Sequence, residues 1–241
     1  MKKYFLFFGY LLSLCLHSQT VKVDYIFTVN IYKPFDFPAT LYANYKGEKM
    51  FSVKYGIEED EPSVGASGVS FTSKEKYDYL LYYSEKGEGL ISDNINEKNY
   101  VLKDKIPKID WEILKEFKEI NKVKLTKAIG SFRGREYVIW FDSTAIVKTG
   151  PWKFNNLPGM IYEAYDSSGN YKWVMKNIDK TNETLTNPFN DFKGEFLQYT
   201  NYPKLKYGLS PELEADLKKN PYNTITEQKR TGLEIKFEWE K

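Results

Sequence analysis

The sequence predicts a mainly β fold, a curved antiparallel meander sheet or half-open barrel with a short C-terminal helix. Several runs alternate apolar and polar residues, and clusters of glycine, asparagine and proline separate them. The chain of 241 residues is also rich in aromatic residues, with 20 Tyr and 16 Phe, which suit a β core. No internal repeat or linker is visible, so residues 19–241 are predicted to form a single β-rich domain.

The first predicted strand is VKVDYIFTVNIY, residues 21–32, where apolar residues alternate from Val21 to Ile31. This pattern is typical of a half-buried antiparallel strand. Two hairpins are predicted next, with turns at KGE (46–48) and SEKGEG (84–89). The polar stretch at 58–70 is predicted to be a mobile loop, and its glycines lack the Lys-Ser/Thr pair of a phosphate-binding loop.

Residues 108–120, KIDWEILKEFKEI, fit two patterns. Trp111, Leu114 and Phe117 recur at helical spacing, whereas Trp111 and Ile113 also fit strand alternation. Periodicity alone leaves both open.

A later segment has clearer helix signals. Ser210 is a good N-cap, Pro211 occupies the first helical position, and Lys218 and Lys219 end the pattern. We predict a short packing helix there, with no chemical role.

The centre of the chain predicts two further hairpins. FRGREYVIWF supplies two strands and a tight turn at Arg133-Gly134, and SSGN joins MIYEAYD to YKWVMKNI. Between them lies GPWKFNNLPG, residues 150–159. Its Pro158-Gly159 pair is predicted to be a structural turn, the centre of a type II turn with Gly159 at positive φ.

The amino terminus has the pattern of a secretory signal peptide. Lys2 and Lys3 precede an apolar run at residues 4–16, which is too short to span a bilayer as a helix. We predict that residues 1–18 are removed near Ser18 or Gln19, leaving no transmembrane span. Cys15 raises the alternative of a lipidated terminus, but Leu14 is bulky where a small residue is needed before the cut.

Removal of residues 1–18 would exclude most of the usual catalytic chemistry, because these residues contain Cys15, the only cysteine, and His17, the only histidine. The mature chain would have no Ser-His-Asp or Cys-His machinery, no Cys/His zinc site and no disulfide. Carboxylate, Tyr, Lys and Ser chemistry remains. The sequence predicts no cofactor and no metal.

Charge argues against a nucleic-acid partner. The 35 basic residues less Lys2 and Lys3 leave 33, against 33 acidic residues, so the mature chain is formally neutral. A neutral protein has no global field that attracts polyanions, and only Arg133, Arg135 and Arg230 are arginines.

The segment GPWKFNNLPGMIYEAYD, preceded by FRGREYVIWF and YVLKDKIPKIDWEI, resembles the GLPGLI family. The resemblance is dense over residues 80–178. Asn156 and Met160 depart mildly from the family name, and Leu125 stands where many members carry cysteine, which argues against a thiol role here. The resemblance implies an exported, envelope-associated protein without an established activity, and an extended WEILKEFKEI. The hairpins also resemble the curved sheet of periplasmic lipoprotein carriers.

One hypothesis is a non-catalytic binding module for an apolar or amphipathic, lipid-like ligand or an envelope protein partner. Trp152, Phe154 and Leu157 would lie at the mouth of a curved sheet, with Arg133 or Arg135 as a charged contact. In the alternative interpretation these apolar residues fill the open end of the core. Ion pairing of the arginines with Glu136, Asp142 or Glu163 is favoured over an anion site.

The second hypothesis is a histidine-free hydrolase that uses paired carboxylates, with Glu163 and Asp166 as the nearest candidates. They lie three residues apart on a strand and therefore on opposite faces, whereas a glycosidase pair must flank one bond. Glu136 could pair with Glu163 across strands, but no sequence feature supports that pairing. Convergence of two carboxylates in one cleft would favour the enzyme.

Overall fold

The computed structural model describes residues 20–55, 78–95, 98–209, 211–219 and 229–240. The predicted signal peptide at 1–18, the predicted loop at 58–70 and the N-cap residue Ser210 lie outside these ranges.

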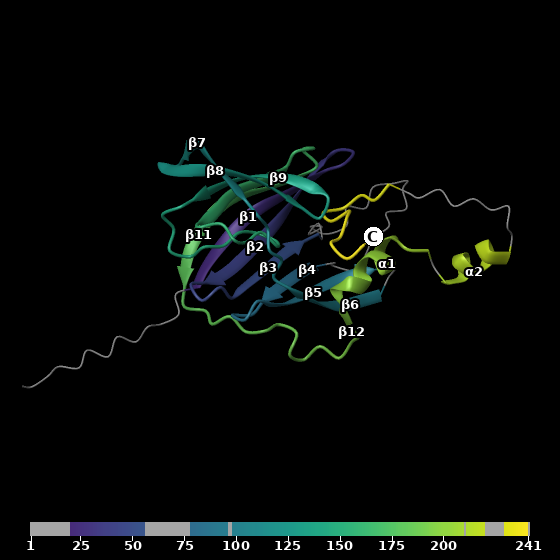
Figure 1. Cartoon of the computed structure of the whole chain (residues 1–241). Helices are drawn as coiled ribbons and strands as arrows, with labels where there is room; N and C mark the ends of the chain where they lie inside the picture. The colour runs from purple at the N-terminus through teal and green to yellow at the C-terminus, as the bar shows by residue number, and fades with distance from the viewer. Residues whose placement is uncertain (1–19, 56–77, 96–97, 210, 220–228, 241) are drawn as a thin grey trace, which may run out of the picture.

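The chain forms two successive groups of strands followed by short helices (Figure 1). The first group is β1 (Thr20–Asn30), β2 (Pro34–Asn44), β3 (Lys49–Lys54), β4 (Asp78–Tyr83), β5 (Glu88–Ile95) and β6 (Lys98–Lys105). The second is β7 (Glu112–Ile120), β8 (Val123–Phe132), β9 (Arg135–Asp142), β10 (Met160–Asp166) and β11 (Tyr171–Thr181). Then come β12 (Phe196–Gln198), the 3-10 helix η1 (Tyr199–Asn201), α1 (Tyr202–Tyr207) and α2 (Pro211–Lys219).

All twelve strands belong to one open sheet in the order β12-β6-β5-β4-β3-β2-β1-β11-β10-β9-β8-β7. Each group is an antiparallel meander, and the long β1–β11 pairing joins the two groups. Only the short β12 runs parallel to its neighbour, β6, among the described strands. Figure 1 shows the sheet curving so that β7–β9 and β4–β6 lie at its two ends. The predicted fold class, a curved meander sheet with a short C-terminal helix, is confirmed.

The predicted hairpin turns are confirmed. Gly47 and Gly87 have φ of 90° and 75° in the first two turns, where glycine avoids a Cβ clash. Arg133 and Gly134 both have positive φ, 44° and 87°, as a two-residue turn requires when its twist matches that of the strands. The ambiguous WEILKEFKEI segment is extended in β7. Ile31 lies beyond the end of β1 and is 40% exposed, so the prediction that the strand and its apolar face extend to Ile31 was wrong.

The concave face of the sheet carries the core. Alternating residues of β1, such as Val23, Tyr25 and Phe27, are buried there, together with Ile139 and Phe141 of β9. The β9–β10 connection, residues 143–159, contributes its own apolar side chains to the same cluster.

Gly159 does not have the predicted positive φ, so the type II turn assigned to Pro158-Gly159 was wrong. The positive φ values in this connection belong to Trp152 (49°) and Asn156 (64°). Gly159 is needed for a different reason. A Cβ at this position would overlap the backbone carbonyl of Asp142, because the connection returns tightly against the end of β9.

We expect Gly159→Ala to lower the free energy of unfolding by about 1 to 3 kcal/mol, since backbone must move to admit one methyl group. Urea unfolding measures the loss. Gly169→Ala is a useful comparison, because Gly169 has a φ of 73° but nothing within 4 Å of its Cβ position. A larger loss of unfolding free energy for Gly169→Ala than for Gly159→Ala would mean that the positive φ of Gly169 is a stronger constraint than the contact of Gly159 with the Asp142 carbonyl.

Candidate functional site

The β9–β10 connection carries its aromatic residues into the core. The Trp152 ring stacks on Trp173 of β11, with centroids 5.8 Å apart, and meets Phe154 edge-on at 5.2 Å. Phe154 meets Tyr137 edge-on at 4.9 Å. Trp111, just before β7, donates its indole N–H to the carbonyl oxygen of Asn155 at 2.7 Å. Aromatic stacking and backbone hydrogen bonds therefore hold this connection in one conformation.

The structure places the three predicted ligand-binding apolar residues inside the protein. Trp152 is 2% exposed, Phe154 0% and Leu157 6%. Their burial agrees with the alternative interpretation, in which these apolar residues fill the open end of the core. Trp152 also forms part of the wall of a cavity described below, so it is the one of the three within reach of a bound molecule.

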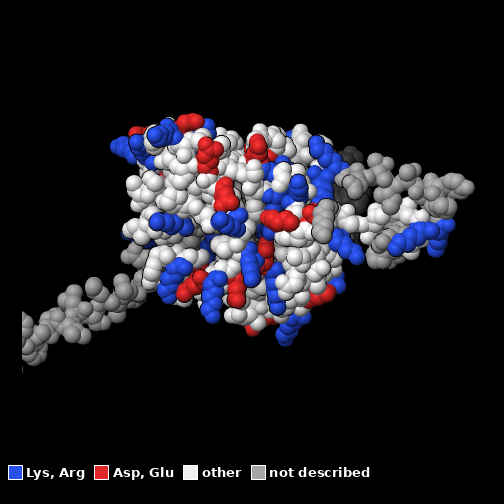
Figure 2. Space-filling view, in the orientation of Figure 1, with Lys and Arg blue, Asp and Glu red and all other residues white. Residues whose placement is uncertain are grey.

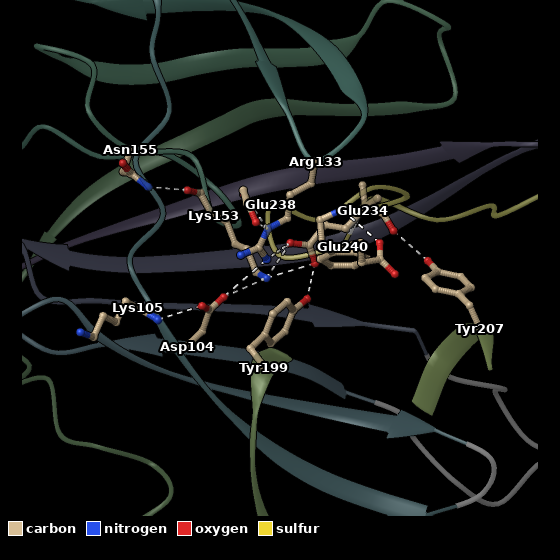
Figure 3. Close-up of polar contacts among 12 residues, drawn as sticks. Asp104, Lys105, Arg133, Lys153, Asn155, Tyr199, Tyr207, Glu234, Glu238 and Glu240 are labelled. Carbon is tan, nitrogen blue, oxygen red and sulfur yellow. Dashed lines mark hydrogen bonds and ion pairs between the residues drawn. The ribbon is translucent and has the colours of Figure 1, made fainter. Parts of the chain in front are cut away.

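A buried ion cluster lies beside this connection (Figure 3). Lys153, fully buried, pairs with Glu234 near the C-terminus at 2.8 Å. Arg133, from the β8–β9 turn, pairs with the same carboxylate. Both cations also lie 3.5 Å from Asp104 of β6. Residues from four segments of the chain thus meet in one ion cluster.

Aromatic rings surround the cluster. The Arg133 guanidinium lies about 5 Å from the rings of Tyr199 (4.9 Å) and Trp239 (5.0 Å), and the Lys153 ammonium lies 3.6 Å from the Tyr199 ring. Cation–π attraction stabilises positive charge in such surroundings. The Tyr199 hydroxyl donates to Glu234. These contacts leave Glu234 with bonds from two cations and one hydroxyl.

The cluster sets the ionisation of its members. Burial alone would raise the pKa of Glu234, but Lys153 and Arg133 more than offset burial and hold that pKa below its ordinary value. Burial lowers the pKa of Lys153 in spite of the opposing effect of Glu234. For Arg133, the effect of burial is outweighed by Glu234 and Asp104, and its pKa rises. Glu234 is therefore a fixed negative charge at neutral pH.

The two predicted contact arginines form ion pairs, but not with the predicted partners Glu136, Asp142 or Glu163. Arg135 pairs with Asp166 at 2.9 Å and donates to the carbonyl oxygen of Gly232 at 2.7 Å. Arg133 pairs with Glu234, Asp104 and, at 3.3 Å, the exposed Glu238. Their partners come mostly from the C-terminal segment, residues 229–240, which these contacts bind to the sheet.

A cavity of about 830 Å³ is lined mainly by the concave face of the sheet and by the segments that follow β11, and Val101, Phe189 and Phe192 of its lining belong to a second apolar cluster on the opposite face of β4–β6. Its walls come from β1, β4, β5, β6 and β11 on the sheet side, and from α1, η1 and the C-terminal segment on the other. Half of its lining residues are aromatic: Tyr55, Tyr79, Tyr100, Tyr171, Tyr199, Tyr202, Tyr207, Phe27, Phe189, Phe192 and Trp152. Its volume lies in the range of small-molecule sites in proteins.

Two carboxylates, Asp93 of β5 and Glu234, line this cavity. Asp93 lies 3.7 Å from the Lys206 ammonium of α1. A second cavity, of about 680 Å³, lies on the other side of Tyr199 and includes Asp104 and Trp239 in its lining. Tyr199 therefore separates two hollows, with the ion cluster next to both.

The carboxylates predicted from the sequence lie elsewhere. Glu163 pairs with Lys118 and, at 2.9 Å, with Lys172, and these lysines lower its pKa although burial would raise it. Asp166 is buried against Arg135. As predicted, their side chains lie on opposite faces of β10. Neither residue lines either cavity.

Comparison with known proteins gives a fold and no more. No protein-family model matches the chain, and no curated protein does. Two solved structures of PNGF-II, in C2 and P21 crystals, share the fold at TM-scores of 0.50 and 0.51. They are each 14% identical to this chain over 75% and 78% of its length. The match spans 31% and 33% of the PNGF-II chain, about a third of that protein.

The described residues contain no group of three or more metal-ligating side chains and no helix long and apolar enough to cross a membrane. Acidic and basic side chains are interspersed on the face shown in Figure 2. Exposed ion pairs among the described residues, such as Lys46–Glu85 at 3.0 Å, also place opposite charges next to each other.

One further buried cation lies next to the β9–β10 connection. Lys49 of β3 is 3% exposed, and its ammonium donates to the carbonyl oxygens of Phe154 at 2.9 Å and Gly150 at 3.3 Å. The Tyr83 ring lies 5.6 Å away. Burial lowers the pKa of Lys49 to about 7, because two carbonyl oxygens replace only part of its hydration.

This lowered pKa predicts a stability that rises with pH. Between about pH 7 and the unfolded-state pKa of about 10.4, the unfolded chain binds more protons than the folded one, so folding becomes more favourable as pH rises. Lys49→Met removes this dependence. We expect the free energy of unfolding of the wild type, relative to that of Lys49→Met, to rise by up to about 1.4 kcal/mol per pH unit between pH 7 and 10.

Urea unfolding of both proteins at several pH values measures this difference, in which contributions from the buried tyrosines cancel. Lys54→Met, at an exposed position of the same strand, should follow the wild type. Parallel curves for the wild type and Lys49→Met would contradict a lowered pKa.

Proposed function

We propose that this chain is an exported, non-catalytic binding module of the cell envelope, and that its ligand is amphipathic and lies in the tyrosine-lined cavity. The observation that carries the proposal is this cavity of about 830 Å³, half of whose lining residues are aromatic. Pockets of a few hundred to a thousand Å³ with mostly apolar walls and a few fixed polar groups are typical of ligand sites. The signal-peptide pattern and the resemblance to GLPGLI proteins support export to the envelope.

The charges favour binding over the alternative of a hydrolase that uses paired carboxylates. Asp93 and Glu234 do share the cavity, which is the arrangement that such an enzyme needs. A general acid, however, needs a raised pKa, and Lys153 and Arg133 hold the pKa of Glu234 low. Asp93 has its own ammonium partner in Lys206. Each carboxylate is thus already engaged by cations of the protein, and the cavity is better suited to hold a molecule than to transfer a proton to it.

Blocking the cavity tests the proposal. Val29 of β1 lines it, so Val29→Trp should fill part of the space. Val138→Trp places the same side chain on the outer face of β9 and serves as the matched control, because Val138 lies between the buried positions 137 and 139. Circular dichroism and thermal melting establish that both variants fold.

Two measurements follow on protein purified from exporting cells: mass spectrometry of extracted small molecules, and titration with the uncharged dye N-phenyl-1-naphthylamine. We expect the wild type and Val138→Trp to carry a molecule or to bind dye with one saturable site, and Val29→Trp to do neither. A wild type that neither carries a molecule nor saturates with dye would exclude the proposed site. Equal binding by all three proteins would place the site elsewhere.

A further inference from the structure

The lining of the cavity is poorly matched to an acyl chain. Its aliphatic residues are few, namely Val29, Ile91, Val101 and Leu233, against seven tyrosines. A hydrocarbon chain would cover those tyrosine hydroxyls that have no partner in the protein without giving them one, and a buried polar group left without a hydrogen bond is destabilising. The ligand must therefore bring hydrogen-bonding groups to the walls.

Two wall residues are available for such bonds. Within the part of the chain that the structure describes, no hydrogen bond involves the hydroxyl of Tyr55 or Tyr79. Burial raises the pKa of both residues, so both hydroxyls stay protonated and can donate as well as accept. They lie at the ends of strands β3 and β4, on one side of the cavity.

The charges of the lining are matched within the protein. Lys206 faces Asp93 at 3.7 Å, and Arg133 and Lys153 face Glu234. An acidic headgroup would find no unpaired cation among the described lining residues, and a cationic group would have to compete with an ammonium that is already in place. Because burying an unpaired charge is costly, the occupant that fits is electrically neutral.

The arrangement of rings provides flat apolar faces next to these polar groups. Tyr199 and Tyr202 stack at 4.9 Å with planes 8° apart, and Tyr207 meets Tyr202 nearly perpendicularly at 6.4 Å. Ring faces carry partial negative charge and attract polarised C–H groups. A pyranose ring has such C–H groups on its faces and hydroxyls around its edge, so it can satisfy stacking and hydrogen bonding at once.

We propose that the occupant of the tyrosine-lined cavity is a neutral saccharide of a few rings. The inference rests on the proposed binding function and adds the ligand class. Tyr79 supplies a hydrogen bond to a sugar hydroxyl, and the partly buried rings of Tyr202 and Tyr207 hold the sugar rings.

Tyr79→Phe tests the assignment cleanly, because it removes a hydroxyl that has no partner among the described residues and leaves the ring in place. Its melting temperature should equal that of the wild type. Its affinity for saccharide should fall about 3- to 10-fold, the loss of one hydrogen bond. Tyr165→Phe, on the outer side of β10, is the matched control and should bind as the wild type does.

The probes are an array of neutral and acidic oligosaccharides, calorimetric titration with the best neutral glycan, and sodium laurate as the acyl competitor. Binding to neutral glycans that Tyr79→Phe weakens and Tyr165→Phe does not would support the inference. Laurate binding at the cavity without any glycan binding would overturn the saccharide assignment and leave the binding function standing. A preference for acidic glycans would overturn the assignment of a neutral ligand. No binding to glycans, laurate or dye would overturn both.

Discussion

Trp152→Ala is expected to lower the free energy of unfolding by about 3 to 5 kcal/mol, the range for deleting a large buried aromatic side chain. The Trp152 ring fits between Trp173, Phe132 and Phe154, at centroid distances of 5.2 to 5.8 Å. Its backbone also has a φ of 49°, which a bulky residue adopts only where the surrounding packing compensates for the strain. Loss of the ring removes that compensation and leaves a void that neighbouring rings are too rigid to fill.

Denaturant unfolding of Trp152→Ala beside Trp140→Ala measures this effect. Trp140 is half-buried on the outer face of β9, where it contacts the ammonium of Lys118 at 4.5 Å rather than other rings. Its removal should cost clearly less. Equal losses for the two variants would show that the Trp152 ring does not stabilise the core more than an outer-face tryptophan does.

Glu234→Gln is the second substitution with a large expected effect, about 3 kcal/mol or more. The amide preserves the shape of the side chain but removes the charge that balances Arg133 and Lys153, both of which are buried. Asp104 remains 3.5 Å from both cations and keeps the loss near the lower end of the range for breaking a buried pair.

Glu238→Gln is the matched control. Its carboxylate also pairs with Arg133, at 3.3 Å, but its side chain is 59% exposed, so its loss should cost at most about 1 kcal/mol. Thermal or urea unfolding distinguishes the two variants. A Glu234→Gln protein as stable as Glu238→Gln would mean that Asp104 alone neutralises the two cations.

The low pKa of Glu234 makes its contribution to the free energy of unfolding depend on pH in the acidic range. Its contribution to stability is present above the unfolded-state pKa of about 4.3 and is lost as pH falls through the lower folded-state pKa. The difference between the wild type and Glu234→Gln should therefore shrink below about pH 4. A difference that does not change with pH would mean that the carboxylate is not ionised in the folded protein.

Much of the sheet could be predicted from local patterns. The alternation in β1, β9 and β10 places successive side chains on opposite faces, and the turn at Arg133-Gly134 needs two residues with positive φ. Both are properties of a few neighbouring residues. The predicted type II turn at Pro158-Gly159 was wrong, because it explained Gly159 by its backbone conformation alone. Gly159 is instead constrained by the carbonyl of Asp142, which comes near only in the folded chain.

The candidate site depended on contacts that no local pattern contains. Lys153 lies in the most conspicuous stretch of the sequence, but nothing there indicates that its partner is Glu234, 81 residues later. Glu234 itself lies in an ordinary alternating run, GLEIKFEWE.

By itself, then, the sequence determined the β class, the hairpins and the limited chemistry of a chain that lacks histidine and cysteine beyond residue 18, because side-chain alternation, turn conformation and composition are local properties. Only the tertiary structure decided which charges are buried together and where the tyrosines enclose a cavity. Burial and pairing of charge depend on segments that meet only after the sheet has curved and the C-terminal segment has packed against it.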